Sequence, residues 1–365
     1  MPANPSDLRA PRRALAIAAL RHRLRLDFVG LGAEAAAAEF SAAWNHLLDN
    51  HSGHAARELT VAVPENDREA LDAAQAQATS LITLALIELN LGRGLLFHAA
   101  AGADAHGRAF LLVGPSGAGK TTAIAYLARA ASYLTDETAF VDEQTDVLPY
   151  PKPLSVVREL GGKTETSPAE LGLVLPTRDR FRVGRVLIVD RRHTPHTPTS
   201  ARLSTAEGIM AVVAQLSGLS SHPTPLFALA HLAREVGGFE RLSYSDVRDI
   251  DPYAGPPASP PLGSDELAFL LPARRHHEET GTGLVQALVD DAIEVSGVIL
   301  VAQGGHVKVL SGIARTMWLH TIRPTPEVVL LRVLRGIHGR VSDDEMHFRR
   351  VVDGLIEGGI LEWRP

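Results

Sequence analysis

The sequence predicts an α/β protein with a small N-terminal α/β lobe, a P-loop nucleotide-binding core and a C-terminal α+β winged-helix module. Strand-like and helix-like patterns alternate through residues 24–244, as in α/β proteins. A glycine-rich segment, residues 114–121, lies between a strand pattern and a helix pattern. A proline-rich stretch, residues 251–263, precedes a last group of strands and helices, which indicates a separate C-terminal domain.

Length and composition set the broad class. A chain of 365 residues is too long for one ordinary core, so we expect two or three domains. The net charge of −6 excludes a bulk electrostatic attraction to nucleic acid or to an anionic membrane. The absence of cysteine excludes disulfides, thiolate catalysis and cysteine-bound zinc.

The sequence shows no targeting or membrane signal. No apolar stretch of about 20 residues predicts a membrane-spanning helix, and the arginines scattered through residues 1–25 are unlike a signal peptide. We therefore expect a cytoplasmic protein that acts without nucleic acid and without a membrane. The composition leaves open whether the chain forms a homo-oligomer.

The N-terminal lobe is predicted to span residues 1–90. Residues 1–12 contain three prolines and are expected to form a loose tail. After the tail, the patterns predict strand 24–29, helix 33–48, strand 58–63 and helix 67–90. No catalytic constellation is recognisable in this lobe, and its role is left open.

The P-loop is the strongest motif in the chain. Residues 114–121, with the sequence GPSGAGKT, follow the apolar strand 109–113 and precede the helix 122–129. The glycines let backbone N–H groups close around a phosphate, where the helix dipole adds positive potential. Lys120 supplies a charge for the β- and γ-phosphates, and the Thr121 hydroxyl is a candidate Mg²⁺ ligand. The predicted nucleotide-binding residues are Gly114, Ser116, Gly117, Ala118, Gly119, Lys120, Thr121 and Thr122.

Two adjacent carboxylates follow the P-loop helix. Asp136 and Glu137 lie inside the strand-like pattern 131–142, and neighbouring side chains of a strand point to opposite faces. One carboxylate can then face the phosphates while the other points elsewhere, or the strand twist can bring both to a metal. Because phosphate-bound magnesium and a hydroxyl nucleophile both need a carboxylate nearby, we favour a functional role over a solvated strand end.

Two weaker signals lie on either side of the P-loop in the sequence. His98 belongs to a predicted hairpin with the P-loop strand, and is either a core histidine or a group for proton transfer or phosphate contact. Residues 182–190 resemble a Walker B strand ending in a metal-binding Asp190. The basic residues 191–193 that follow either reach the phosphoryl group or form a surface cluster. The sequence does not decide between Glu137 and Asp190 as the magnesium partner.

The core is predicted to span residues 91–253 and to be followed by a linker, 254–284. Within the core, Ser204 and Glu207 form a capping-box pattern before helix 206–216, followed by helix 225–236 and strand 239–244. The linker contains the run 276–279, HHEE, which we interpret as a solvated loop rather than a metal site, because adjacent residues do not share a helix face.

Residues 285–365 are predicted to form the winged-helix module. The pattern gives strands 292–295, 297–301 and 307–310, with a turn at residues 304–305, and helices 313–321, 327–337 and 343–357. The helices carry many acidic residues, which disfavours binding to DNA. The exposed edge of the small sheet is suited instead to pair with an added peptide strand.

Residues 95–251 resemble the HPr serine kinase/phosphorylase family, especially its shortened relatives with a PEP-carboxykinase-like core. The features that carry this resemblance are His98, the P-loop, residues 133–137 (YLTDE) and the proline-rich residues 149–153. The resemblance implies ATP and Mg²⁺ as cofactors and Asp136 as the base for the acceptor hydroxyl. Glu137 stands where better-studied members have a second Asp, and the loop that grips HPr is not recognisable, so HPr is not the expected acceptor. The implied catalytic residues are Asp136, His98 and Lys120, and the implied metal contacts are Thr121, Glu137 and Asp136.

Residues 288–363 look like a PqqD-type module, which binds the leader segment of a peptide precursor by strand addition. Together, the two likenesses imply a kinase that phosphorylates a Ser or Thr hydroxyl of a peptide precursor or small protein held by the C-terminal module. Two alternatives stay open: a kinase of a free small molecule, and a nucleotide-dependent peptide-binding protein without transfer. The sequence identifies neither the acceptor nor the choice between ATP and GTP or another donor.

Overall fold

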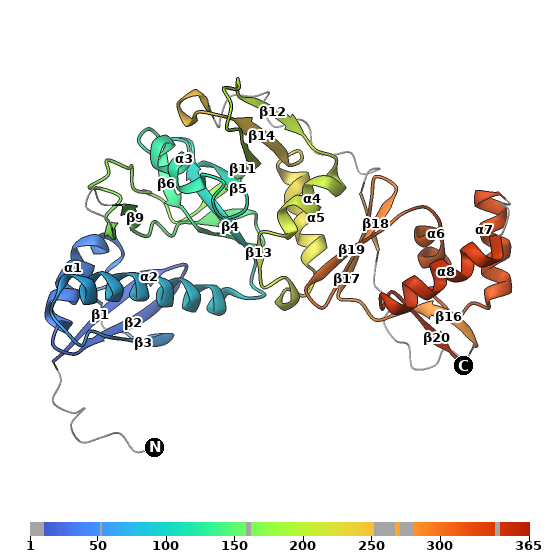
Figure 1. The fold of residues 1–365 in the computed structure, drawn as a ribbon, viewed down its shortest axis with the longest axis horizontal. Helices are drawn as coiled ribbons and strands as arrows, with labels where there is room; N and C mark the ends of the chain where they lie inside the picture. The colour runs from blue at the N-terminus through green and yellow to red at the C-terminus, as the bar shows by residue number, and fades with distance from the viewer. Residues whose placement is uncertain (1–10, 52, 158–161, 252–266, 271–280, 340–343) are drawn as a thin grey trace, which may run out of the picture. The chain divides into compact units, whose positions relative to one another are not determined.

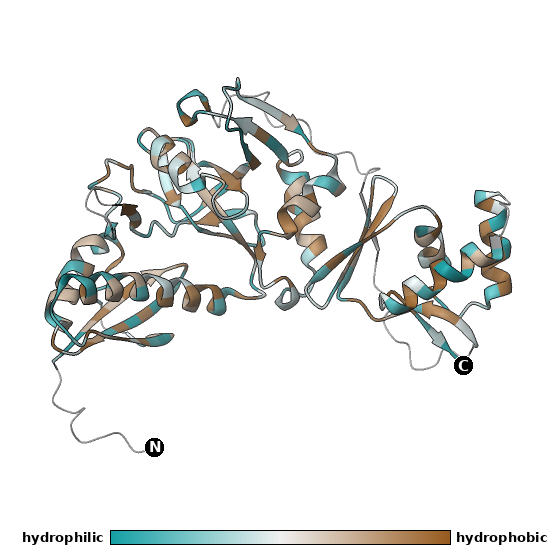
Figure 2. Cartoon of the chain, in the orientation of Figure 1, coloured by the Kyte–Doolittle hydropathy of each residue, from teal (hydrophilic) through white to brown (hydrophobic). Residues whose placement is uncertain are grey.

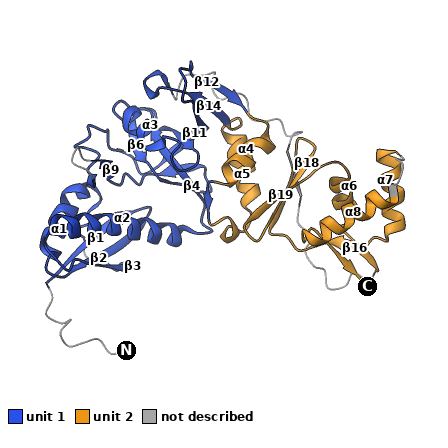
Figure 3. Cartoon of the chain, viewed as in Figure 1, with its two compact units in different colours: residues 1–202, 215–217, 240–258 blue, residues 203–214, 218–239, 259–365 orange. Residues whose placement is uncertain are grey.

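The computed structural model describes all residues except 1–10, 52, 158–161, 252–266, 271–280 and 340–343. The predicted loose tail, most of the predicted linker and the run 276–279 therefore lie outside the described residues. The chain divides into two compact units, which are shown in Figure 3. Unit 1 comprises residues 1–202, 215–217 and 240–258, and unit 2 comprises residues 203–214, 218–239 and 259–365.

The N-terminal lobe of unit 1 is a three-stranded sheet covered by helices (Figure 1). Its strands are β1 (Arg12–Ala19), β2 (His22–Val29) and β3 (Arg57–Ala62), and its helices are α1 (Ala33–Ala43), η2 (Asn45–Leu47) and α2 (Arg68–Asn90). Strand β1 was not predicted, and the predicted helix 33–48 ends at Ala43 and continues as a 3₁₀ turn. The Asp67 side chain accepts a hydrogen bond from Ala70 N and caps α2, where the sequence placed the start of this helix.

The hydrophobic core of the lobe continues into the nucleotide-binding core. Phe40 and Trp44 stack with ring centroids 5.0 Å apart, and Trp44 lies 6.3 Å from the ring of Tyr150. Tyr150 is fully buried and its hydroxyl is 3.0 Å from Thr83 Oγ1 on α2. One cluster of buried residues therefore joins the lobe to the segment that follows β8.

The nucleotide-binding core of unit 1 is built on a nine-stranded sheet. Along the sheet the order is β12-β14-β11-β5-β4-β7-β8, with β6 and β13 paired to β4, and β8 also pairs with the start of β11. The bounds are β4 (Leu95–Ala103), β5 (Arg108–Val113), β6 (Ser132–Thr135), β7 (Thr138–Val141), β8 (Asp146–Leu148), β11 (Phe181–Arg191), β12 (Thr199–Arg202), β13 (Leu216–Ser217) and β14 (Glu240–Tyr244). The predicted hairpin of β4 and β5 is confirmed.

Three neighbouring strands of this sheet are parallel, and their carboxyl ends share one edge. β5 pairs with β11, and β11 pairs with β14, in both cases in parallel. Helix α3 (Lys120–Leu127) follows β5, the 3₁₀ turn η4 (Val247–Asp249) follows β14, and a two-stranded sheet of β9 (Leu154–Val157) and β10 (Lys163–Thr166) completes the core. Ligands of open α/β sheets bind beyond the carboxyl ends of parallel strands, so this edge is where a site is expected.

Unit 2 combines two helices with the C-terminal module. α4 (Thr205–Val213), η3 (Leu219–Ser221) and α5 (Pro225–Glu235) precede the strands β15 (Leu267–Leu270), β16 (Gly283–Gln286), β17 (Asp291–Val295), β18 (Val298–Gln303) and β19 (His306–Leu310), the helices α6 (Gly312–His320), α7 (Glu327–His338) and α8 (Asp344–Glu357), and β20 (Leu361–Arg364). The capping box of Ser204 and Glu207 is confirmed. Phe227 N at the start of α5 donates a 2.8 Å hydrogen bond to Asp291 Oδ2, which links α5 to β17.

Hydrophobic residues follow the elements that form the cores. Figure 2 shows them concentrated on the central strands of the core sheet and on the β17–β18 hairpin, while α2 carries both kinds of residue. Among the described helices, α2 is long and apolar enough to cross a membrane by length and composition, but half of its most apolar stretch is buried inside the protein. This burial is typical of a core helix.

Candidate active site

The P-loop connects the middle of the core sheet to helix α3. Gly117 and Gly119 have φ angles of +82° and +85°, a left-handed conformation that residues with a Cβ rarely adopt. A Cβ on Gly114 would lie 2.8 Å from Val189 Cγ2, so this glycine lets β11 pack closely against the loop. The loop thus has a backbone conformation that turns successive N–H groups toward an anion.

Lys120 is buried at the start of α3. Its Nζ donates hydrogen bonds to Gly114 O at 2.6 Å and to Pro115 O at 3.0 Å, so the ammonium group folds back over its own loop. Burial lowers the pKa of Lys120, while the negative charges of Glu137 and Asp136 oppose this shift. A phosphate bound in the loop would replace the two carbonyl oxygens as the partner of this charge.

The other predicted phosphate-binding residues are accessible to a ligand. Ser116, Gly117, Thr121 and Thr122 are exposed, and Ala118 and Gly119 are half-buried. The Thr121 hydroxyl lies in the first turn of α3, where a metal ligand of a P-loop is expected. The accessible N–H groups and the adjacent lysine fit a triphosphate.

Asp136 and Glu137 do not belong to one continuous strand, which corrects the prediction. β6 ends at Thr135 and β7 begins at Thr138, and the two acids form a bend between them that stays beside β4, since Ala99 N donates to Glu137 O at 3.0 Å. The alternation of side chains to opposite faces therefore does not apply here. Both carboxylates reach one cation instead.

That cation is Lys152, which sequence reasoning missed. Its Nζ lies 3.1 Å from Asp136 Oδ1 and 3.4 Å from Glu137 Oε2. Burial disfavours the charge of Lys152, but the two carboxylates outweigh it and raise the pKa of the lysine above its ordinary value. The only hint in the sequence was a lysine held between two prolines, Pro151 and Pro153, in an otherwise apolar segment.

Two further polar residues surround this cluster. The Tyr133 hydroxyl lies 3.1 Å from both Asp136 Oδ1 and Lys152 O, and burial together with Asp136 raises its pKa. On β10, burial raises the pKa of Glu165, although the positive charge of Lys152 opposes this shift. One oxygen of Glu165, Oε2, is buried without a hydrogen-bond partner among the described residues. The cluster therefore joins β6, the bend that follows it, the segment before β9, and β10.

His98 lies within the electrostatic range of both the P-loop and the carboxylates. It pairs with Thr138 across the β4–β7 ladder, and its backbone N donates to Gln215 O at 2.7 Å. Burial and then the positive charge of Lys120 lower the pKa of His98, while Glu137 and Asp136 oppose the shift. The imidazole is therefore neutral at pH 7 and able to accept a proton.

The strand predicted over residues 182–190 is confirmed as part of β11, but Asp190 does not join the carboxylate cluster. Asp190 Oδ2 lies 2.7 Å from Arg192 Nη2 and accepts a 3.0 Å hydrogen bond from Ser243 Oγ. The Arg191 side chain lies beside the start of the P-loop helix: a Cβ on Gly119 would be 3.3 Å from Arg191 Cδ. Asp190 and Arg191 are consecutive at the end of β11, but they thus have different surroundings.

A cavity of about 130 Å³ lies beside the start of α3. It is lined by Gly119, Thr122 and Ala123 from the P-loop side and by Arg191 and residues 244–247 from the ends of β11 and β14. The Tyr244 hydroxyl is buried without a hydrogen-bond partner among the described residues. This cavity lies next to Gly119 and Thr122 of the predicted phosphate site.

The site supplies few metal ligands of its own. Among the described residues, no group of three or more Asp, Glu, His or Cys side chains is placed to hold a metal ion. Magnesium in phosphate-transfer sites takes one or two protein oxygens together with phosphate oxygens and waters. Thr121, Asp136 and Glu137 are the residues that fit this role.

The comparisons with known proteins include a distant structural likeness. No family model and no curated protein sequence matches this chain. Among solved structures, the Hpr(Ser) kinase/phosphatase from Coxiella burnetii is similar over 41% of this chain and 85% of that chain, with 12% sequence identity and a TM-score of 0.24. A superposition this loose assigns no residue, so a function has to be argued from the geometry of the site itself.

Proposed function

We propose that this protein is an ATP-dependent kinase that transfers the γ-phosphoryl group to a Ser or Thr hydroxyl of a peptide or small protein. The observation that carries the proposal is the pairing of a P-loop with the lysine-bound carboxylates Asp136 and Glu137. Ala99 on β4 links the two groups: it pairs with Val113, the residue directly before the P-loop, and its N–H donates a 3.0 Å hydrogen bond to Glu137 O. A phosphate cradle next to a buried carboxylate is the minimum that a hydroxyl kinase needs.

In the proposed reaction, the acceptor oxygen forms a bond to the γ-phosphorus while the bond to the bridging oxygen of ADP breaks. Asp136 accepts the proton of the acceptor hydroxyl, and Lys120 with the loop N–H groups balances the charge on the phosphate oxygens. Mg²⁺, held by Thr121 and the carboxylates, would neutralise further phosphate charge. Lys152 and Tyr133 hold Asp136 in position.

The acceptor is proposed to be a peptide held by the C-terminal module. β19 pairs with β18 and has no second partner strand among the described residues. In an antiparallel hairpin closed by a two-residue turn, the N–H groups of Val307 and Val309 point away from β18. Added pairing there would hold a leader segment and raise the concentration of the acceptor at the site.

The first experiment measures phosphate transfer from γ-labelled ATP to candidate peptides that contain a Ser or Thr. Asp136→Asn should lower transfer by about 100-fold or more, because it removes the base, while the P-loop should keep most of the ATP binding. Asp72→Asn, on the surface of α2, is the matched control and should behave as wild type. An Asp136→Asn variant with full activity would show that the base is assigned wrongly.

A second experiment separates the peptide kinase from its alternatives. Val309→Pro removes an outward N–H from β19 and should raise KM for the peptide with little change in kcat, whereas Val309→Thr should not. A small-molecule kinase would phosphorylate its substrate equally well in both variants. A peptide-binding protein without transfer would bind ATP and peptide but give no phosphopeptide by mass spectrometry.

A further inference from the structure

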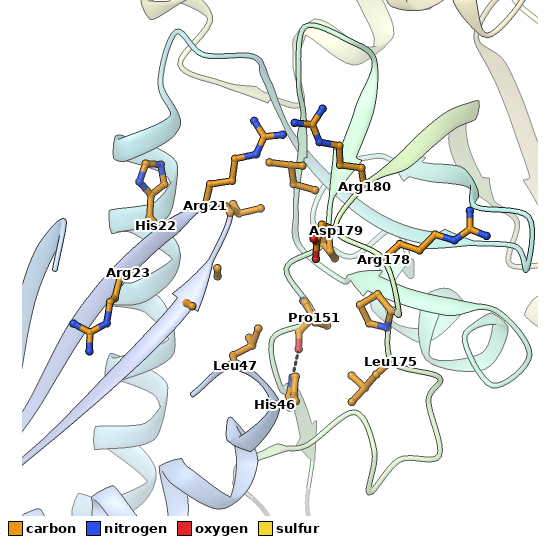
Figure 4. A pocket seen from close by; sticks show the side chains of 16 residues that line it. Arg21, His22, Arg23, His46, Leu47, Pro151, Leu175, Arg178, Asp179 and Arg180 are labelled. Atoms are coloured by element: carbon orange, nitrogen blue, oxygen red, sulfur yellow. Dashed lines mark hydrogen bonds between the residues drawn. The ribbon is translucent and has the colours of Figure 1, made fainter. Parts of the chain in front are cut away.

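Unit 1 contains a larger pocket that the proposed reaction does not use (Figure 4). Its volume is about 730 Å³, and it is lined by residues 18–23, 46–47, 148–149, 151, 175–176 and 178–180. None of these residues belongs to the P-loop or to the carboxylate cluster. The volume lies within the range of sites for small molecules.

Two arginine side chains meet at one end of the pocket, and the lining also contains one acid, Asp179. Arg21 Nη2 and Arg180 Nη1 both contact Asp142 Oδ2, at 3.2 and 3.7 Å, so two guanidinium groups share one carboxylate oxygen. Both arginine side chains are half exposed. Figure 4 shows them extending to the same end of the pocket, while Arg23 and Arg178 point away from it. Each guanidinium group has further N–H donors besides the one that faces Asp142 Oδ2, so this end can accept a second anion.

The rest of the pocket is mainly apolar. Its walls include Ala18, Leu20, Leu47, Leu148, Leu175 and Pro176. A ligand with an apolar body would remove this surface from water, while its anionic group would lie between the two arginines. The pocket thus combines the two features of a site for an amphiphilic anion.

The backbone beside the charged end is strained. Leu20 and Arg21 form the two-residue turn between β1 and β2, with φ angles of +48° and +65°. Such turns normally use Asn and Gly, because residues with larger side chains disfavour positive φ. Here Leu20 is buried and Arg21 is directed to Asp142, so the turn places an arginine at the pocket at a cost in backbone strain.

We propose that this pocket binds a small amphiphilic anion, with its carboxylate or phosphate group between Arg21 and Arg180 and its apolar body along the walls. The pocket is also connected to the candidate active site along the backbone. His46 Nε2 donates a 2.6 Å hydrogen bond to Pro151 O, and the next residue is Lys152. A bound ligand therefore stabilises the segment that positions the carboxylate cluster, whether or not the cluster transfers phosphate.

The first test is a titration of the full-length protein, measured by isothermal calorimetry. The probes are hexanoate, hexyl phosphate and the neutral hexan-1-ol, and Lys120→Ala is titrated in parallel to remove phosphate binding at the P-loop. Both anions should bind in both proteins, and hexan-1-ol should bind at least about tenfold more weakly. Replacing hexanoate by butyrate should weaken binding by about 15-fold, since each methylene contributes about fourfold.

Variants of the pocket complete the test. Arg180→Gln should weaken binding of hexanoate by about tenfold, and Arg180→Lys by less. Ala18→Trp should abolish binding, because the larger side chain fills the pocket without changing a charge. Ala18 is an exposed residue of β1, so the indole has room outside the core. Arg57→Ala, on an exposed arginine outside the pocket, is the matched control and should bind as wild type. Hydrogen exchange of the backbone amides of Leu148, Tyr150 and Lys152 should slow when hexanoate is added to the wild type.

Three results would overturn the proposal. The first is the absence of anion binding at millimolar concentrations, or binding of hexyl phosphate alone that disappears in Lys120→Ala. The second is equal affinity for hexanoate and hexan-1-ol. The third is unchanged binding in both Ala18→Trp and Arg180→Gln. Arg180 has an exposed side chain, so its variant stays informative if Ala18→Trp does not fold.

Discussion

Removal of the Lys152 charge should strongly destabilise unit 1. Lys152 and Asp136 are each about 5% exposed, and their charged atoms are 3.1 Å apart. With an effective dielectric constant of about 20, their attraction is about 5 kcal/mol. Lys152→Met keeps the apolar stem but leaves Asp136 buried without its counter-ion, so we expect a loss of about 3–5 kcal/mol in the free energy of unfolding. Glu137 adds little to this loss because it is 47% exposed.

Urea unfolding at pH 7 measures this loss. Trp44 and Tyr150 are buried in the same hydrophobic core of unit 1. In a Trp318→Phe, Trp363→Phe background, the fluorescence of Trp44 therefore reports on the unfolding of unit 1. Lys163→Met is the control, because Lys163 is an exposed lysine for which a change within about 0.5 kcal/mol is expected.

A double variant isolates the charge effect. Asp136→Asn combined with Lys152→Met should be at least about 1 kcal/mol more stable than the sum of the single losses predicts, since neither charge is then left alone. If Lys152→Met costs less than about 1 kcal/mol, or if the two losses simply add, the buried ion pair does not form in solution.

Three further predictions concern the P-loop side of the site. Folding lowers the pKa of His98 below its ordinary value of 6.5, so the unfolded chain binds more protons and stability falls as the pH drops through about 6.5. His98→Gln should make this fall smaller in urea unfolding at pH 7.5 and 5.5, and an equal fall would contradict the neutral imidazole. Gly114→Ala should lower the free energy of unfolding by about 1–3 kcal/mol, because its Cβ would press on Val189. Gly184→Ala on β11 is the control and should be tolerated, since its Cβ meets only ordinary contacts. Equal losses of stability in the two variants would contradict the close approach of Val189 to Gly114. Arg191→Ala should raise Kd for a fluorescent ATP analogue by about tenfold without a change in stability, and unchanged affinity would exclude Arg191 from the nucleotide site.

Local patterns predicted the parts of the fold that depend on neighbouring residues. Helix α2 with its Asp67 cap, the β4–β5 hairpin, the capping box at Ser204 and the glycine turn of β18–β19 all follow from residues within a few positions of each other. β1 was missed because its alanine-rich sequence alternates weakly, and its strand character comes from pairing with β2 along its whole length.

The candidate site was predicted only in part for a related reason. The P-loop is recognisable because strand, loop and helix are contiguous in the sequence. The bend at Asp136 and Glu137 and their pairing with Lys152 depend on contacts across fifteen or more residues, which no periodicity reveals. Tyr133 was noticed as part of a motif, but its contacts with Asp136 and Lys152 required the folded chain.

The bend gives the site a chemical property that a continuous strand would lack. In a straight strand, Asp136 and Glu137 would point to opposite faces, and only one could approach the phosphates. In the bend, both approach Lys152, whose positive charge offsets part of the repulsion between the two neighbouring carboxylates. An arriving magnesium ion or hydroxyl proton would compete with Lys152 for the same oxygens. The lysine that orders the cluster therefore also limits how strongly its carboxylates bind a metal or a proton, and this balance makes Lys152, as much as Asp136, the residue on which the proposed chemistry depends.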